Sequence, residues 1–208
     1  ALLLTGPESI GKTTFARTLV AAMFCQAKEN PRPCGICLAC RKLTSGNHPD
    51  FIEAAPEDRT ASLKIDAIRE IERFLALTPK ESRYKVALIR GFERATTGAA
   101  NALLKTLEEP PGYAHLILLT TDADLLLPTI VSRTQQINLR PLPRRDIAEA
   151  LVDRWQVEAE KAQRLARVSG GRIGWAVHAA TDASALESMD DALATLLEIL
   201  GQDLPARF

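Results

Sequence analysis

Residues 6–13 form a phosphate-loop motif, and this motif leaves few folds open to the chain. They read Gly-Pro-Glu-Ser-Ile-Gly-Lys-Thr, which fits the pattern G-x4-G-K-[S/T]. The apolar run Leu2–Thr5 precedes the motif, and a helical pattern from Lys12 to about Phe24 follows it. A strand, a glycine-containing loop and a helix in this order are the context in which the pattern binds phosphates. The chain is therefore expected to have an α/β fold built on this unit.

The residue types of the loop suit the phosphates of a nucleotide such as ATP. Glycines let backbone N–H groups turn inward around an anion, and the N-terminus of the following helix adds partial positive charge. Lys12 would reach the β- and γ-phosphates, and the Thr13 hydroxyl would bind Mg²⁺. A turn with a chance Lys-Thr pair is the competing interpretation, which the flanking strand and helix disfavour. The predicted nucleotide-binding residues are Gly6, Pro7, Ser9, Gly11, Lys12, Thr13 and Thr14.

The acidic residue that a phosphate-loop NTPase uses to hold Mg²⁺ is missing from the obvious place, the end of a neighbouring strand. The candidate strand 85–89 ends in Arg90-Gly91, and a cation at that position would repel the metal. Glu93 follows two residues later and is expected to be poorly placed as a substitute. The rival strand 116–119 ends in Thr120-Thr121, which offers hydroxyls. We expect nucleotide binding with little or no hydrolysis, and weak binding of Mg²⁺.

Four cysteines fall within residues 25–40, and the rest of the chain has none. A C-x2-C pair holds two ligands on one tight turn, and tetrahedral Zn²⁺ takes four such sulfurs. Because four thiolates close the coordination, the predicted zinc site is structural. An iron–sulfur cluster or a redox pair is the alternative, but nothing else in the chain suggests electron transfer. His48 is a conceivable extra ligand, although a local hydrogen bond is its favoured role. The predicted ligands are Cys25, Cys34, Cys37 and Cys40.

Further apolar runs alternate with helical patterns over the first 140 residues. Continuous apolar runs of this kind indicate a parallel sheet covered by helices on both faces. Together with Leu2–Thr5 they predict five parallel strands. The other predicted strands are 51–54, 85–89, 115–120 and 136–139, and the other predicted helices are 66–77 and 97–109.

The pattern changes after Pro141, where only helices are expected. They cover 144–155, 158–168 and 184 to about 200, and we place a domain boundary near Pro141–Pro143. The chain begins inside a predicted strand and ends just after a helical stretch. We therefore expect that it has been trimmed at both ends.

Composition excludes several classes of protein. The chain has 208 residues, of which 46% are hydrophobic and 25% charged, values typical of a globular protein. No apolar run approaches the roughly 20 residues of a membrane span, and no signal peptide is recognisable, so a cytoplasmic location is expected. The 26 basic and 26 acidic residues cancel, which gives no global mark of a nucleic-acid binder.

The order of these segments resembles the subunits of the bacterial replicative clamp loader of DNA polymerase III, within the AAA+ superfamily. The resemblance covers about residues 1–140 and begins with the phosphate loop and the cysteine module. Further motifs that carry it are GNHPD at 46–50, ID-x-IR at 65–69, YKV at 84–86, NALLKTLEEPP at 101–111 and LPTIVSR at 127–133. The stretch after 141 matches only in its helical character.

The resemblance implies a role in DNA replication. Clamp loaders are hetero-pentamers of motor ATPase and other subunits, including the delta subunit, that open a sliding clamp and close it around primed DNA. One member does not hydrolyse ATP itself and inserts the arginine of a Ser-Arg-Cys motif into the ATP site of a neighbouring motor subunit. Here the motif reads Ser132-Arg133-Thr134, so Arg133 is the candidate arginine finger in trans. The family often has glycine where this chain has Ser9.

The resemblance also implies the domain organisation. Residues 1–140 would be the AAA+ core with its inserted zinc module at 25–40, residues 141–182 a small helical lid, and residues 183–208 the start of a helical collar domain. Three alternatives remain open. The chain could be an active motor ATPase of the same loader, an unrelated phosphate-loop kinase, or a zinc-stabilised scaffold that binds no nucleotide.

Overall fold

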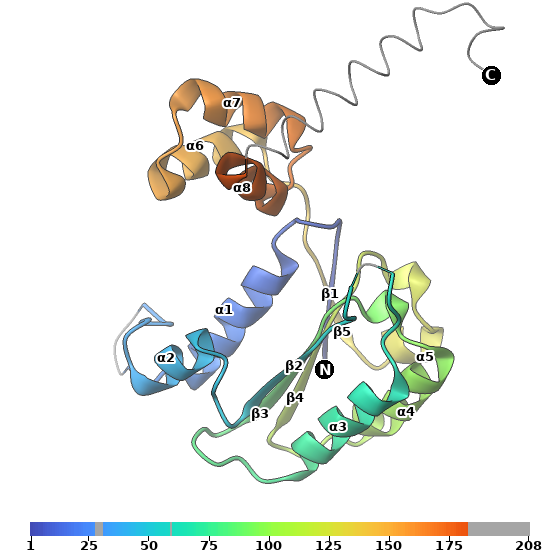
Figure 1. The fold of residues 1–208 in the computed structure, drawn as a ribbon. Coiled ribbons are helices and arrows are strands. Elements are labelled where there is room, and N and C mark those ends of the chain that lie inside the picture. Colours follow the sequence, from blue (N-terminus) through green and yellow to red (C-terminus); the bar gives the residue numbers. More distant parts are fainter. Residues whose placement is uncertain (28–30, 59, 183–208) are drawn as a thin grey trace, which may run out of the picture. The chain divides into compact units, whose positions relative to one another are not determined.

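The computed structural model describes residues 1–27, 31–58 and 60–182 (Figure 1). The chain divides into two compact units at the bond between Arg140 and Pro141. No helix in these described ranges is both long and apolar enough to cross a membrane.

The first unit is built on a five-stranded parallel sheet, which confirms the predicted fold class. Its strands lie in the order β2-β3-β4-β1-β5 (Figure 1). Strand β1 pairs with β4 on one side and with β5 on the other. The strands are β1 (Leu2–Thr5), β2 (Phe51–Ala54), β3 (Lys85–Ile89), β4 (Ala114–Leu119) and β5 (Gln135–Asn138).

Helices cover both faces of this sheet, and β3 shows why. All five of its residues are buried, because side chains of a strand alternate between faces and here both faces meet apolar layers. Ala87 and Ile89 pack into one hydrophobic cluster, with residues of α3 and α4. Val86 and Leu88 pack into the other, with residues of α1. The helices of this unit are α1 (Lys12–Phe24), α2 (Leu38–Thr44), α3 (Ile65–Ala76), α4 (Thr97–Glu108) and α5 (Pro128–Val131), with short 3₁₀ turns η1 (Phe92–Arg94) and η2 (Ala123–Leu125).

The sequence accounts for these helices. Helix α3 buries Ile68, Ile71 and Leu75, which recur at helical spacing on one face. Helix α4 starts at the Thr96 side chain, which accepts a hydrogen bond from the backbone N–H of Ala99 at 3.2 Å. It ends just before the two prolines 110 and 111, which cannot continue a helix.

The second unit contains three described helices around a small apolar core. They are α6 (Arg144–Trp155), α7 (Ala159–Val168) and α8 (Ile173–Thr181). Gly171 has a φ of +84°, and a Cβ atom there would lie 2.4 Å from Cβ of Pro141, so no other residue fits. Trp155 of α6 is 40% exposed, whereas Trp175 of α8 packs against this core. The helix and collar segment predicted after residue 182 lie outside the described residues.

Candidate nucleotide and metal sites

The phosphate loop connects the carboxyl end of β1 to the N-terminus of α1. Gly6 and Gly11 have φ values of +139° and +104°, which side-chain-bearing residues rarely adopt. A Cβ on Gly6 would also lie 2.5 Å from the carbonyl oxygen of Leu139, just after β5. The Gly6 N–H donates to the carbonyl oxygen of Thr121, just after β4, at 3.3 Å. The segments that follow β4 and β5, the two strands beside β1, therefore hold the phosphate loop in place.

Ser9 occupies a left-handed backbone position in this loop, with a φ of +58°. That conformation costs a residue with a Cβ roughly 1–2 kcal/mol. Glycine at this position would avoid the strain. The serine side chain itself is exposed and does not fill the loop.

Lys12 lies across the opening of the loop. Its Nζ atom donates to the carbonyl oxygens of Gly6 at 2.5 Å and of Pro7 at 2.8 Å. Burial lowers the pKa of Lys12, while the carboxylates of Glu93 and Glu8 act in the opposite direction. A phosphate group entering the loop would offer this ammonium a charged partner in place of two neutral carbonyls.

The remaining predicted phosphate ligands follow in the first turn of α1. Thr13 is half-buried and Thr14 is exposed. Thr14 also lines a cavity of about 840 Å³ beside α1, whose other walls include β2 and the segment around the cysteines. The structure thus brings all seven predicted residues, 6 to 14, into one loop and helix start.

Arg90 does not point freely into the phosphate site. Its Nε atom lies 2.7 Å from Oε1 of Glu53 on β2. Arg17 of α1 shares this carboxylate, with both of its hydrogen bonds to Glu53 at 2.9 Å. The sequence predicts a repelling cation at the metal position, but no local pattern reveals that a carboxylate of the neighbouring strand β2 engages the Arg90 side chain.

The four cysteines lie together at the end of α1 and the start of α2. Their Sγ atoms are all within 4.8 Å of one another, and no disulfide joins them. Backbone N–H groups point at two of the sulfurs: Cys34 donates to Cys25 Sγ, and Cys37 to Cys34 Sγ, both at 3.4 Å. Such hydrogen bonds favour thiolates, and that of Cys34 is the largest cause lowering the pKa of Cys25. These four residues could bind a metal ion, and four clustered sulfurs suit Zn²⁺.

His48 lies outside this sulfur cluster and has a local role. Its Nδ1 atom accepts the backbone N–H of Asp50 at 3.2 Å, and its ring lies against Phe24, with centroids 4.5 Å apart. Burial lowers the pKa of His48, which keeps the ring neutral. The histidine thus joins the two ends of the inserted cysteine module.

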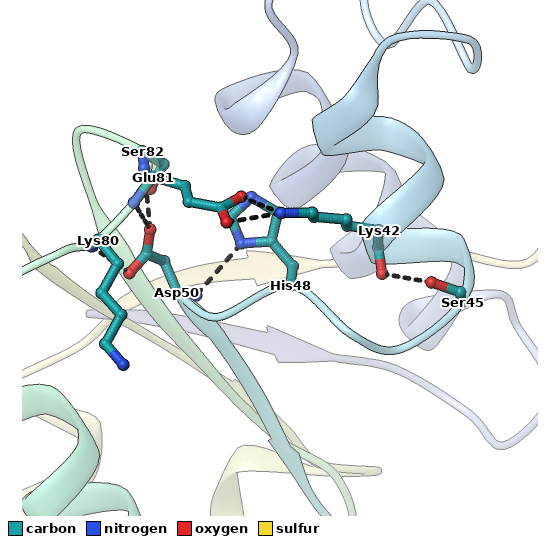
Figure 2. Close-up of polar contacts among 7 residues, drawn as sticks. All are labelled: Lys42, Ser45, His48, Asp50, Lys80, Glu81 and Ser82. Carbon is teal, nitrogen blue, oxygen red and sulfur yellow. Dashed lines mark hydrogen bonds and ion pairs between the residues drawn. The ribbon is translucent and has the colours of Figure 1, made fainter.

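Asp50 anchors the same region to the sheet (Figure 2). The residue is fully buried, and its carboxylate accepts backbone N–H groups from residues 80, 81 and 82, at 2.7, 2.8 and 2.8 Å. Burial alone would raise the pKa of Asp50, but these hydrogen bonds outweigh it and leave that pKa lowered. The adjacent Lys42–Glu81 ion pair, at 2.5 Å, links α2 to the same loop.

Arg133 lies between α5 and β5, away from the phosphate loop. Its guanidinium donates to Glu108 Oε1 of α4 at 2.9 Å and to the carbonyl oxygen of Thr129 at 3.0 Å. Its side chain is 35% exposed. Arg133 precedes β5, whereas the phosphate loop follows the parallel strand β1. Arg133 and the phosphate loop therefore lie at opposite ends of the strands. The pairing of Arg133 with Glu108 has no signal in the sequence, since no local pattern pairs residues 25 positions apart.

The parallel sheet, with a phosphate loop after β1, defines a phosphate-loop protein of the AAA+ class. A solved structure of a DNA polymerase III gamma subunit-related protein from Thermotoga maritima is similar, with a TM-score of 0.55 and 28% identity. The match covers 79% of this chain and 53% of that one.

Sequence comparison narrows the class to one family. The family described as DNA polymerase III, delta subunit, matches residues 1–143, and the chain belongs to this family. It is 38% identical over 176 residues to the DNA polymerase III subunit delta' of Pseudomonas aeruginosa, covering 82% of this chain and 52% of that protein. It is 40% identical over 147 residues to the gamma subunit of Buchnera aphidicola subsp. Schizaphis graminum, covering 71% and 40%. The chain thus spans about half the length, or less, of these curated relatives. An unrelated phosphate-loop kinase does not agree with this membership.

Proposed function

We propose that this chain is a clamp-loader subunit of DNA polymerase III that binds ATP with little or no hydrolysis and supplies Arg133 to the ATP site of a neighbouring subunit. Its partners would be the motor ATPase and delta subunits of a hetero-pentamer, and through the complex the sliding clamp and primed DNA. Family membership supports the coarser part of this proposal.

The position of Arg133 is the observation that carries the finer part. Strand β5 spans roughly 10 Å and separates Arg133 from the end of the sheet where the phosphate loop lies. Arg133 therefore cannot act on a nucleotide bound in its own phosphate loop. A surface guanidinium held by Glu108 and Thr129 is ordered before it meets a partner. Such a fixed cation could stabilise the charge that develops on the γ-phosphate of an adjacent subunit's ATP.

The other parts of the proposal rest on the two sites. The phosphate loop supports ATP binding, and Arg90-Gly91 in place of an acidic pair supports weak turnover. Cys25, Cys34, Cys37 and Cys40 would hold a structural Zn²⁺. Residues 141–182 would be the small helical lid domain, and residues 183–208 would begin the collar domain.

The test is steady-state ATP hydrolysis by the reconstituted loader with clamp and primed DNA. The full-length subunit carries Arg133→Ala, and Arg145→Ala, which removes an exposed arginine of α6, is the matched control. We expect the Arg133 variant to assemble normally and to lower turnover about tenfold or more, because an arginine finger contributes a large factor to hydrolysis. Arg133→Lys should fall between the two, since lysine keeps the charge without the planar fork. Unchanged turnover by an assembled Arg133→Ala complex would refute the role in trans.

A motor ATPase of the same loader is the second candidate. It is favoured by the 40% identity to a gamma subunit over 147 residues, which exceeds the 38% identity to the delta' relative over 176 residues. The isolated full-length subunit decides between them. Turnover that is abolished by Lys12→Ala would favour the motor, whereas ATP binding without turnover would favour the non-hydrolysing subunit.

A further inference from the structure

Glu93 carries a buried carboxylate oxygen that lacks a partner. Among the described residues, three buried side-chain polar atoms make no hydrogen bond: Arg90 Nε, Glu93 Oε2 and His115 Nε2. Arg90 Nε still has the Glu53 carboxylate as an ion-pair partner at 2.7 Å, whereas no partner is found for Glu93 Oε2. Two of the three follow β3 directly, at the carboxyl edge of the sheet. An unpartnered buried carboxylate oxygen is costly, so a native protein usually retains one only where something else binds it.

The backbone after β3 explains how Glu93 comes to lie there. Gly91 adopts a left-handed conformation with a φ of +59°, which turns the chain into the 3₁₀ turn η1. Phe92 of this turn is 2% exposed and packs into the core, and so fixes the turn. Glu93 is therefore on an ordered element beside the edge where β1 delivers the phosphate loop.

The charge of Glu93 acts on the phosphate loop. It opposes the effect of burial on the pKa of Lys12 more strongly than Glu8 does, although Glu8 belongs to the loop itself. The geometry agrees, because the parallel strands β3 and β1 end on the same side of the sheet, where Glu93 Oε2 is buried and the phosphate loop begins. Arg90, the cation that would repel a metal, is meanwhile engaged by Glu53 on β2, at 2.7 Å.

The geometry points to Glu93 as the metal-holding carboxylate of the nucleotide site: its unpartnered Oε2 atom takes the role of the missing acid at position 90 and holds a divalent cation beside the bound nucleotide. This inference rests on the nucleotide binding proposed above. It reverses the expectation that Glu93 is poorly placed, because Gly91 and the 3₁₀ turn bring it back to the sheet edge. Carboxylate oxygens are the protein ligands that Mg²⁺ favours in such sites.

The test measures ATP binding to the full-length subunit by calorimetry, with Mg²⁺ and in magnesium-free buffer. No chelator is used, because it would also remove metal from the cysteine cluster. In the unaltered protein Mg²⁺ should strengthen ATP binding. Glu93→Gln keeps the volume of the side chain and should reduce the Mg²⁺-dependent increase in ATP affinity about tenfold. Glu70→Gln, an exposed glutamate of α3, is the matched control and should leave the gain unchanged.

A second variant and a second measurement guard against a folding defect. Adding Arg90→Asp to Glu93→Gln should restore the gain, because it returns a carboxylate to the end of β3. Without nucleotide, Glu93→Gln should unfold at about the same temperature as the unaltered protein, since its Oε2 atom makes no hydrogen bond that the substitution could remove.

The outcomes separate this inference from the proposed function. ATP binding that ignores Mg²⁺, or a Glu93→Gln variant that keeps the full gain, overturns the assignment of Glu93 and leaves nucleotide binding in place. No ATP binding by the unaltered protein in either buffer overturns both nucleotide binding and this inference. The role of Arg133 is affected by neither result.

Discussion

Replacement of Asp50 by asparagine should weaken the first unit more than any surface change. The carboxylate accepts one backbone N–H at Oδ1 and two at Oδ2, from residues 80–82 (Figure 2). In Asp50→Asn the amide oxygen can keep the two bonds on one side. The amide nitrogen then faces the N–H of Lys80, so that two donors meet and neither is satisfied.

The expected loss of stability follows from the number of hydrogen bonds that the substitution removes or weakens. One hydrogen bond to a charged acceptor is lost outright, and such bonds contribute about 1.5–3 kcal/mol. The two that remain are weakened because their acceptor is no longer charged. We expect the free energy of unfolding to fall by about 2–3 kcal/mol, which lowers the melting temperature of a chain of this length by roughly 5–10 °C.

The pH dependence supplies a second signature. Because folding lowers the pKa of Asp50, its contribution to stability is fully present above the ordinary value near 3.8. It is lost as the pH falls from there through the lowered folded pKa. The difference between the unaltered protein and Asp50→Asn should therefore shrink in this acidic range.

Urea denaturation followed by circular dichroism at neutral and acidic pH measures both effects. Asp66→Asn, on a side chain that is 84% exposed, is the control and also reports any loss of metal in acid. If Asp50→Asn matched Asp66→Asn within about 0.5 kcal/mol at neutral pH, the surface range, the anchoring role of Asp50 would be wrong. A difference that stays constant in acid would refute the pKa argument.

Three further predictions concern other parts of the first unit. Gly6→Ala should lower stability by about 2 kcal/mol or more in thermal melts, because its Cβ would meet the carbonyl of Leu139 at 2.5 Å; an unchanged melt would contradict this. The ammonium of Lys85 lies 3.7 Å from the ring centre of Phe74, and burial lowers the pKa of Lys85. Between the lowered folded pKa and about 10.5 the unfolded chain binds the proton and the folded chain does not, so the free energy of unfolding should rise with pH over this range. Lys85→Met should flatten that rise in urea titrations. Cys37→Ser should lower bound zinc, measured by elemental analysis, and the melting temperature together; loss of metal without loss of stability would argue against a structural site.

Much of the fold could be predicted because buried elements have a recognisable hydrophobic pattern in the local sequence. The run Lys85–Ile89 is apolar except for its first residue, and all of it is buried between two helix layers. The phosphate loop and the four cysteines are equally local, since their spacing alone places them together. Strand β5 has a weaker hydrophobic pattern in the sequence, because three of its four residues are exposed at the sheet edge.

Side-chain pairing across distant segments could not be predicted. Glu53 engages Arg90 from a strand 37 positions earlier, and Glu108 holds Arg133 across 25 positions. No sequence pattern specifies such partners, because each depends on which strands become neighbours. Trp155 shows the same limit, since an aromatic residue on a helix gives no local sign of which face the core will cover.

The pairing of β1 has a consequence for the order in which the protein is made. Leu2 lies opposite Ile117 on one side and Gln135 on the other, and β1 pairs with no strand nearer in sequence among those described. Among the five strands of the sheet, β1 is synthesised first, yet its partners β4 and β5 are the last two to emerge. Long-range parallel pairing of this kind is slow and leaves hydrophobic segments uncovered in the meantime. The nascent chain therefore needs protection of Leu2–Thr5 until β5 has been synthesised, and only then can the loop that follows β1 take its final shape.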